Sequence, residues 1–130
     1  MWLASLSESQ RTALLGLAHN VVVSDGLLDP NEETMLDEFK REMSLSSTEE
    51  VEYLELDGIE AIFDSRRSRM IALLNLLRLS YSDGAFEIEE ECVLKEISQA
   101  FEVPDAEFHL LDNWVKRLVS LEEEALNLMG

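Results

Sequence analysis

The stretch SDGLLDPNEE, residues 24–33, recurs 58 residues later as SDGAFEIEEE, residues 82–91. In the same ungapped register Met43 falls on Phe101, so an apolar position that follows is matched as well. A glycine after a helix adopts the left-handed backbone that ends it, and acidic residues stabilise the first turn of the next helix. The pattern therefore predicts a helix, an Asp-Gly turn and a second helix, present twice. Because one helix pair cannot bury its apolar face alone, we expect the two units to pack together with approximate twofold symmetry.

Apolar residues outside the turns recur at the spacing of an α-helix. Leu14, Leu17 and Val21 form one stripe, and Leu73 and Leu77 belong to another, as expected for helices with one buried side. The chain holds two prolines and five glycines, and no Asn-Gly hairpin signal joins alternating segments. We therefore expect an all-α fold. It would be a compact bundle of about seven helices with two pseudo-symmetric helix–turn–helix repeats, in a single domain over residues 1–130.

Capping residues mark where the expected helices begin. Ser7 with Gln10 has the spacing of a capping box. Asp29 caps the second helix, Pro30 suits its first position, and Glu32 reaches back to the cap. The expected helices cover about residues 7–24, 29–43 and 46–56, a short segment from 57, then 66–81, 88–101 and a long last segment from 104 that could break near 120.

The charge of the chain excludes several functions. Its 130 residues include 28 Asp and Glu against 10 Lys and Arg, a net charge of −18. Because 46% of the residues are hydrophobic, the chain is not a disordered acidic tail. A surface this negative repels phosphate backbones and anionic lipid leaflets, so we expect no nucleic-acid binding. No apolar stretch approaches the roughly 20 residues that a membrane span needs, so we expect no direct membrane insertion.

The single cysteine, Cys92, excludes an internal disulfide and a cysteine-based metal cluster. The N-terminal residues lack the basic and apolar regions of a signal peptide. Both observations favour a cytoplasmic protein.

The repeated turn is a candidate cation site. Its residues resemble the second half of a calcium-binding EF-hand loop, in which Asp, Gly, an apolar residue and a final Glu hold the same offsets, although the first half has no oxygen ligands. If the two turns come together, their carboxylates would recruit a hard ion such as Ca²⁺ or Mg²⁺. The candidate metal ligands are Asp25, Asp29, Glu32, Asp83, Glu87 and Glu90.

A purely structural interpretation of the same acids stays open. Asp29 with Glu32 is already a complete capping box that requires no metal. In the second copy Glu87 is a poorer helix cap than Asp, which weakens this interpretation there.

No motif in the chain predicts an enzyme. His19 and His109 lack the neighbouring ligands of zinc or di-iron sites. The chain contains no nucleophile elbow, phosphate-binding loop or dinucleotide-binding motif. We therefore expect no catalytic residues and no organic cofactor.

At the duplicated Ser-Asp-Gly turn, with Glu32 and Leu36 or Glu90 and Leu94 downstream, the chain resembles the tellurite-resistance TerB-like family, over about residues 12–119. The resemblance implies an all-helical fold with two pseudo-repeats and a divalent-cation site formed by the six acids named above. Family members occur as bacterial cytoplasmic proteins, in stress-response complexes at the inner face of the membrane, and as a domain of a membrane-anchored DnaJ-like co-chaperone. A membrane-associated protein partner is therefore implied.

Two functional hypotheses follow. The first is a non-enzymatic acidic module that binds a divalent cation and a protein partner in a bacterial stress response. The second is a metal-free, co-chaperone-like adaptor whose acids cap helices and steer a basic partner electrostatically.

Overall fold

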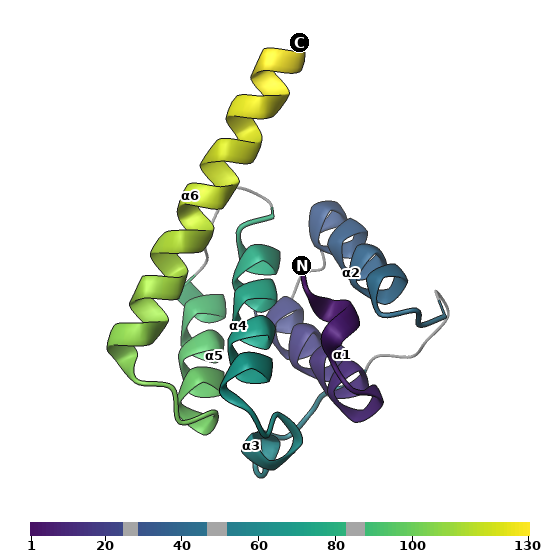
Figure 1. Cartoon of the computed structure of the whole chain (residues 1–130), viewed down its shortest axis with the longest axis vertical. Coiled ribbons are helices and arrows are strands. Elements are labelled where there is room, and N and C mark those ends of the chain that lie inside the picture. The colour runs from purple at the N-terminus through teal and green to yellow at the C-terminus, as the bar shows by residue number, and fades with distance from the viewer. Residues whose placement is uncertain (25–28, 47–51, 83–87) are drawn as a thin grey trace.

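The computed structural model describes residues 1–24, 29–46, 52–82 and 88–130. Within these ranges the chain forms six α-helices and one short 3-10 helix, and no β-strand. The elements are η1 (Leu3–Ser5), α1 (Glu8–Val23), α2 (Pro30–Glu42), α3 (Ile59–Ile62), α4 (Arg66–Ser80), α5 (Ile88–Ala100) and α6 (Asp105–Met129). The predicted all-helical fold class is confirmed (Figure 1).

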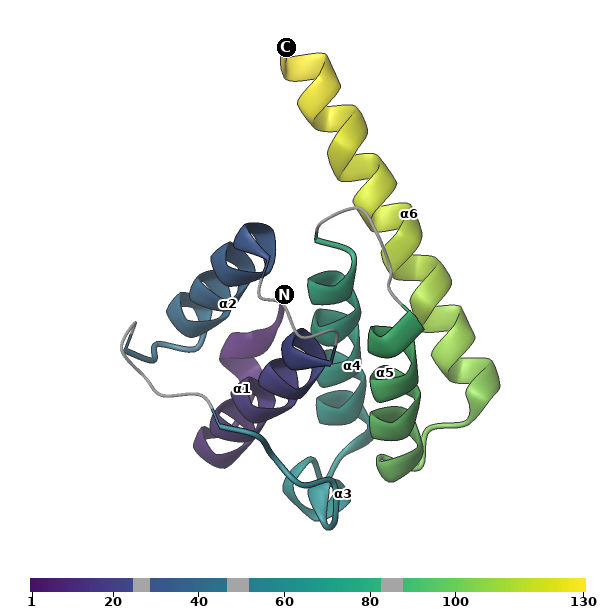
Figure 2. The same ribbon diagram turned by 180° about the vertical axis from the view of Figure 1, so that it is seen from behind.

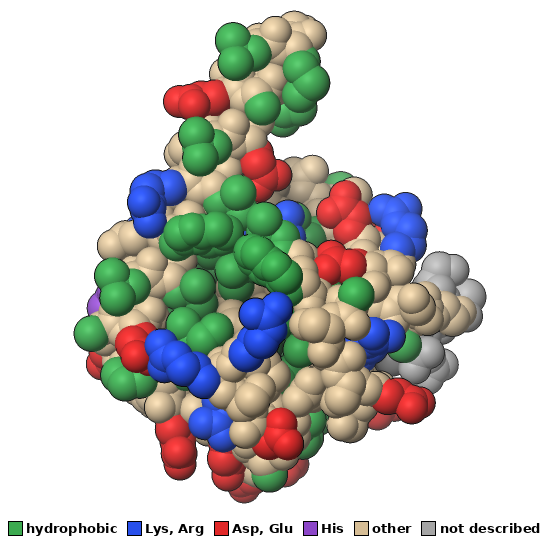
Figure 3. Space-filling model, in the orientation of Figure 1, with side chains coloured by type: hydrophobic (Ala, Val, Ile, Leu, Met, Phe, Trp, Pro, Cys, Tyr) green, Lys and Arg blue, Asp and Glu red, His purple; other side chains and the backbone are tan. Residues whose placement is uncertain are grey.

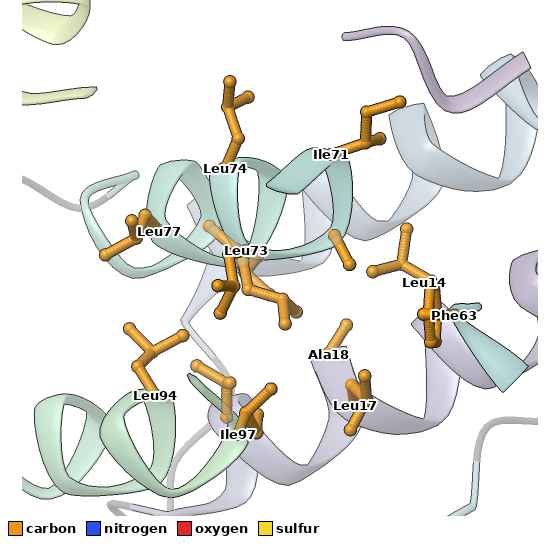
Figure 4. Packing of buried hydrophobic residues seen from close by; sticks show 14 of the residues in the cluster. Leu14, Leu17, Ala18, Phe63, Ile71, Leu73, Leu74, Leu77, Leu94 and Ile97 are labelled. Carbon is orange, nitrogen blue, oxygen red and sulfur yellow. The ribbon is translucent and has the colours of Figure 1, made fainter. Parts of the chain in front are cut away.

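Helix α4 lies at the centre of the bundle and packs against α1, α2, α5 and α6 (Figure 1). Its sequence explains this position, because apolar side chains surround most of its circumference and ten of its residues are buried. Figure 4 shows Leu73 and Leu77 of α4 beside Leu94 of α5 and Ala18 of α1. The shared core thus joins the first helix pair, α1 and α2, to the second, α4 and α5.

The helix starts follow the capping chemistry of the sequence. The Ser7 hydroxyl accepts a hydrogen bond from the Gln10 N–H, and the Gln10 side chain accepts one from the Ser7 N–H. The expected box at α2 is also present. A third box, in which Ser65 pairs with Ser68 ahead of α4, was not predicted.

The helix predicted over residues 46–56 is wrong wherever the structure describes it, since Ser46 and residues 52–56 are non-helical. The backbone of Leu54 instead pairs with the side chain of Asn20 on α1. The Asn20 amide donates to the Leu54 carbonyl (2.6 Å) and accepts from the Leu54 N–H (3.0 Å). Gly16 makes room for this segment, because a Cβ there would lie 2.8 Å from the Leu54 Cβ.

The break expected near Ser120 is absent, and α6 is one continuous helix through Met129. No proline or glycine lies between Pro104 and Gly130, so nothing in the covalent backbone interrupts it. With one predicted helix missing, six α-helices rather than about seven occupy the described residues. None of these six combines the length and apolarity required to cross a membrane.

The two helix pairs share backbone and arginine contacts at the 58-residue offset. Helices α1 and α4 begin at matching positions, and α2 and α5 begin and end at matching positions. Arg11 donates to the Met43 carbonyl (2.8 Å), and Arg69 donates to the Phe101 carbonyl (3.1 Å). In each half an arginine of the first helix therefore holds the end of the second.

The second helix of each pair also ends in the same way. Ser44 and Glu102 both adopt the left-handed conformation, with φ of 59° and 60°. The residue after each donates its N–H to the carbonyl five residues back, at 2.8 and 3.0 Å, which satisfies an otherwise unpaired helix-end carbonyl. The twofold relation between the halves stays a prediction.

Candidate functional site

Three of the six predicted metal ligands lie in the described part of the chain. These are Asp29, Glu32 and Glu90. Asp25, Asp83 and Glu87 lie outside the described residues.

Asp29 and Glu32 cap α2. The Asp29 carboxylate accepts a hydrogen bond from the Asn31 N–H at 2.7 Å, and Glu32 Oε1 accepts one from the Asp29 N–H at 3.3 Å. This reciprocal pair satisfies two N–H groups that the helix start leaves without an intrahelical partner. Both acids therefore have a structural role in the absence of any metal.

Glu32 and Glu90 occupy the third position of α2 and α5, and both are almost fully buried. The exposed fraction is 2% for Glu32 and 1% for Glu90. Both side chains therefore lie on the core-facing side of their helices. Burying an ionised carboxylate costs several kcal/mol unless hydrogen bonds or an opposite charge compensate it. Buried carboxylates thus occur at matched positions in the two halves.

Among residues 1–24, 29–46, 52–82 and 88–130, no three His, Cys, Asp or Glu side chains are grouped so that they could hold a metal ion. The described acids alone therefore do not form a cation shell. Whether the two acidic turns converge stays a prediction, since it depends on Asp25, Asp83 and Glu87 as well.

A groove of about 330 Å³ between α2 and α6 was not predicted. Its apolar lining comes from Met35 of α2, Tyr81 after α4, and Val119 and Leu126 of α6. The acids Glu38, Glu122 and Glu123 also line it, and Arg78 is the one base among its described lining residues. The sequence signal that could have found it is the pair of apolar residues Val119 and Leu126, seven positions apart on α6.

A larger groove of about 870 Å³ lies between the start of α1 and residues 52–54. Its polar lining includes Ser7, Glu8 and Thr12, and Tyr53 forms part of its wall. None of the predicted site residues and no histidine or cysteine is among its described lining residues.

Tyr81 links the end of α4 to α6. Its hydroxyl donates a hydrogen bond to the Asp112 carboxylate at 2.7 Å, and Lys116 lies 3.3 Å from the other Asp112 oxygen. Burial, the hydrogen bond to Asp112 and the negative charge of Asp112 all raise the pKa of Tyr81 above that of a free tyrosine. The phenol therefore stays protonated, as a donor, in the folded chain.

This link predicts a loss of folding stability above about pH 10, the ordinary pKa of tyrosine. The unfolded chain then releases a proton that folded Tyr81 retains, so the free energy of unfolding falls as pH rises. In a Tyr53→Phe variant, which leaves Tyr81 as the one tyrosine, tyrosinate absorbance should rise only as the protein unfolds. In Tyr81→Phe the stability should depend less on pH. Tyrosinate formed near pH 10 in folded Tyr53→Phe protein would contradict the arrangement.

The chain matches no protein-family model, no curated protein and no solved structure. The resemblance to the TerB-like family therefore rests on the residues of the two acidic turns.

Proposed function

We propose that this chain is a non-enzymatic acidic helical module that binds Ca²⁺ or Mg²⁺ at its two acidic turns and interacts with a protein partner. The observation that carries the cation-binding part is the matched burial of Glu32 and Glu90. A bound cation would place an opposite charge beside two carboxylates that are held away from water. The TerB-like resemblance would place such a module in a bacterial stress response.

The remaining candidate ligands suit a hard cation. Asp25 and Asp29 precede Glu32 within eight residues, and Asp83 and Glu87 precede Glu90 in the same order. Carboxylate oxygens are the ligands that Ca²⁺ and Mg²⁺ prefer, and flexible spacing within a turn suits Ca²⁺ in particular. Each turn contributes three such groups, so two turns together could complete a shell of six.

A metal-free adaptor is the second candidate, and the capping geometry favours it. Asp29 and Glu32 already bond N–H groups at the start of α2. If capping accounts for all of the repeated acids, the module needs no cation, and its charge serves to steer a basic partner.

Thermal unfolding with and without millimolar CaCl₂ or MgCl₂ tests the proposal. Ionic strength is matched with NaCl, because screening of the −18 charge stabilises the fold by itself. At a concentration 100 times the Kd a cation adds about 2.7 kcal/mol of stability, and we expect the Tm to rise by several degrees. The double variants Asp25→Asn/Asp83→Asn and Glu32→Gln/Glu90→Gln should lose this rise.

A matched control is Asp37→Asn/Glu96→Gln, which removes two exposed acids from α2 and α5 and should keep the full rise. An unchanged Tm in the wild type, or an equal rise in Asp25→Asn/Asp83→Asn, would exclude the cation site. Either result would leave the metal-free adaptor as the function.

A further inference from the structure

Helix α6 extends well beyond the rest of the bundle. Figures 1 and 2, which view the molecule from opposite sides, both show its C-terminal half projecting past the other helices. Every residue from 120 to 130 is exposed. Several of these are large and apolar: the exposed fraction is 60% for Leu121, 65% for Leu126 and 88% for Leu128. A soluble domain rarely presents this many apolar side chains on one short segment without a partner.

The apolar residues of α6 follow the spacing of a coiled-coil seam. Successive members are three and four residues apart throughout the helix: Leu111, Trp114, Leu118, Leu121, Ala125 and Leu128. The first three are half-buried against the bundle, whereas the last three are exposed. A seam of this kind packs against another helix, so its exposed half has the pattern of a helix-binding surface.

The groove between α2 and α6 shares Leu126 with the exposed end of α6, and it is lined by a different stripe of the helix from the seam. Leu126 and Val119 of α6 form one wall, and Met35 of α2 contributes to the other. Figure 3 shows hydrophobic side chains gathered on this face, from the base of the projecting helix toward the middle of the molecule. The groove and the exposed end of α6 together offer apolar side chains for an occupant to cover.

The charge of the groove indicates which occupant it suits. Its described lining residues include three acids, Glu38, Glu122 and Glu123, and one base, Arg78. The chain as a whole carries −18, so a second copy would bring the same negative charge to the interface. A segment that combines apolar residues on one side with Lys or Arg beside them would meet both the apolar wall and the acids.

We propose that the groove between α2 and α6, together with the exposed end of α6, is the docking site for a basic amphipathic helix of a protein partner. The proposal deepens the protein-interaction part of the proposed function and rests on it, but it is independent of cation binding. In this mode of binding the partner helix lies in the groove and inserts apolar side chains that are spaced three or four residues apart.

The test uses a fluorescent 18-residue peptide of leucine and lysine, with leucine at the coiled-coil positions. Binding to the full chain is measured by fluorescence anisotropy at increasing salt. Two control peptides are a scrambled sequence of the same composition and a leucine–glutamate version. We expect the patterned basic peptide to bind at least about tenfold more tightly than either control, because only it combines leucines at helical spacing with positive charge. Equal binding of the scrambled peptide would overturn the proposal, since it would show attraction by charge alone.

Paired variants locate the site. Leu126→Ser should weaken binding of the patterned peptide about tenfold, since one buried leucine contact is lost. Leu110→Ser is the matched control, since Leu110 is 70% exposed on the same helix but does not line the groove, and it should bind as wild type. Glu122→Gln/Glu123→Gln should lower the affinity for the peptide and reduce the salt dependence of binding. The control Glu96→Gln/Glu124→Gln removes the same charge at residues that do not line the groove and should have a smaller effect on both. Equal effects within either pair would overturn the assignment to this groove.

Two further measurements separate the possible failures. Sedimentation of the wild type should show a monomer, and a dimer that Leu126→Ser dissociates would identify a second copy as the occupant and overturn the proposal. Peptide binding should be the same with calcium and with a chelator. If peptide binding fails while the cation still raises the Tm, only the docking site is wrong. If the cation effect fails while the peptide binds, only the cation site is wrong.

Discussion

Phe101→Ala is expected to lower the free energy of unfolding by about 4 kcal/mol, the largest effect we expect from a single substitution. Phe101 follows α5 and is fully buried. Its ring meets the edge of Phe63, which is also fully buried, with ring centroids 5.2 Å apart. Truncation would remove this aromatic contact and leave a cavity where α5 ends against the chain between α3 and α4.

Urea unfolding followed by circular dichroism measures the effect. Leu110→Ala, a truncation at an exposed position of α6, serves as the control and should change the stability by less than about 0.5 kcal/mol. A loss below about 1 kcal/mol for Phe101→Ala would show that the two phenylalanines do not form the closed contact seen in the structure.

Arg69→Met is expected to cost about 3 kcal/mol. The Arg69 guanidinium donates to three main-chain carbonyls, those of Phe63 at 2.6 Å, Glu60 at 2.8 Å and Phe101 at 3.1 Å. Hydrogen bonds to a charged group contribute roughly 1.5–3 kcal/mol each, and bonds that share one donor group do not add fully. Methionine keeps most of the aliphatic stem, so the loss would report mainly on the hydrogen bonds.

The control for Arg69 is Arg66→Met, one turn earlier on α4. Arg66 is largely exposed and pairs with Glu107 at the surface, at 2.9 Å, so its replacement should have little effect. Arg11→Met should resemble Arg69→Met, because Arg11 also bonds three carbonyls, including that of Met43. The two arginines bond different carbonyls, so the double variant should lose the sum of the single effects. A double variant no less stable than either single one would contradict independent contributions of the two arginines.

Local chemistry explains which parts of the fold could be predicted from the sequence. The start of α1 depends on Ser7 and Gln10, three residues apart, and the start of α2 depends on Asp29 and Glu32 in the same way. Such short-range pairs are visible in the sequence, so these boundaries agree closely with expectation. Residues 52–56 depend instead on Asn20 and Gly16, more than 30 residues away, and no local pattern indicated that contact.

The same distinction applies to the candidate sites. The burial of Glu32 and Glu90 could be anticipated, because each lies one turn before a leucine of the same helix. The groove required α2 and α6 to be brought together, and their lining residues are 81 to 95 positions apart in the chain. Its sequence signal was the seven-residue spacing of Val119 and Leu126 on α6, which a packed helix and an unpartnered helix share.

The continuity of α6 has a consequence for the thermodynamics of its exposed end. An isolated peptide of ten residues forms little helix in water, because ordering the first turn loses the conformational entropy of several residues for a single hydrogen bond. In α6 the half packed on the bundle supplies that nucleus, so residues 120–129 need only propagation, one bond at a time. Amide exchange should therefore slow progressively from Met129 back toward Val119. A partner would meet a helix that is already formed at its base, and most of the entropy of ordering would be lost before the encounter rather than during it.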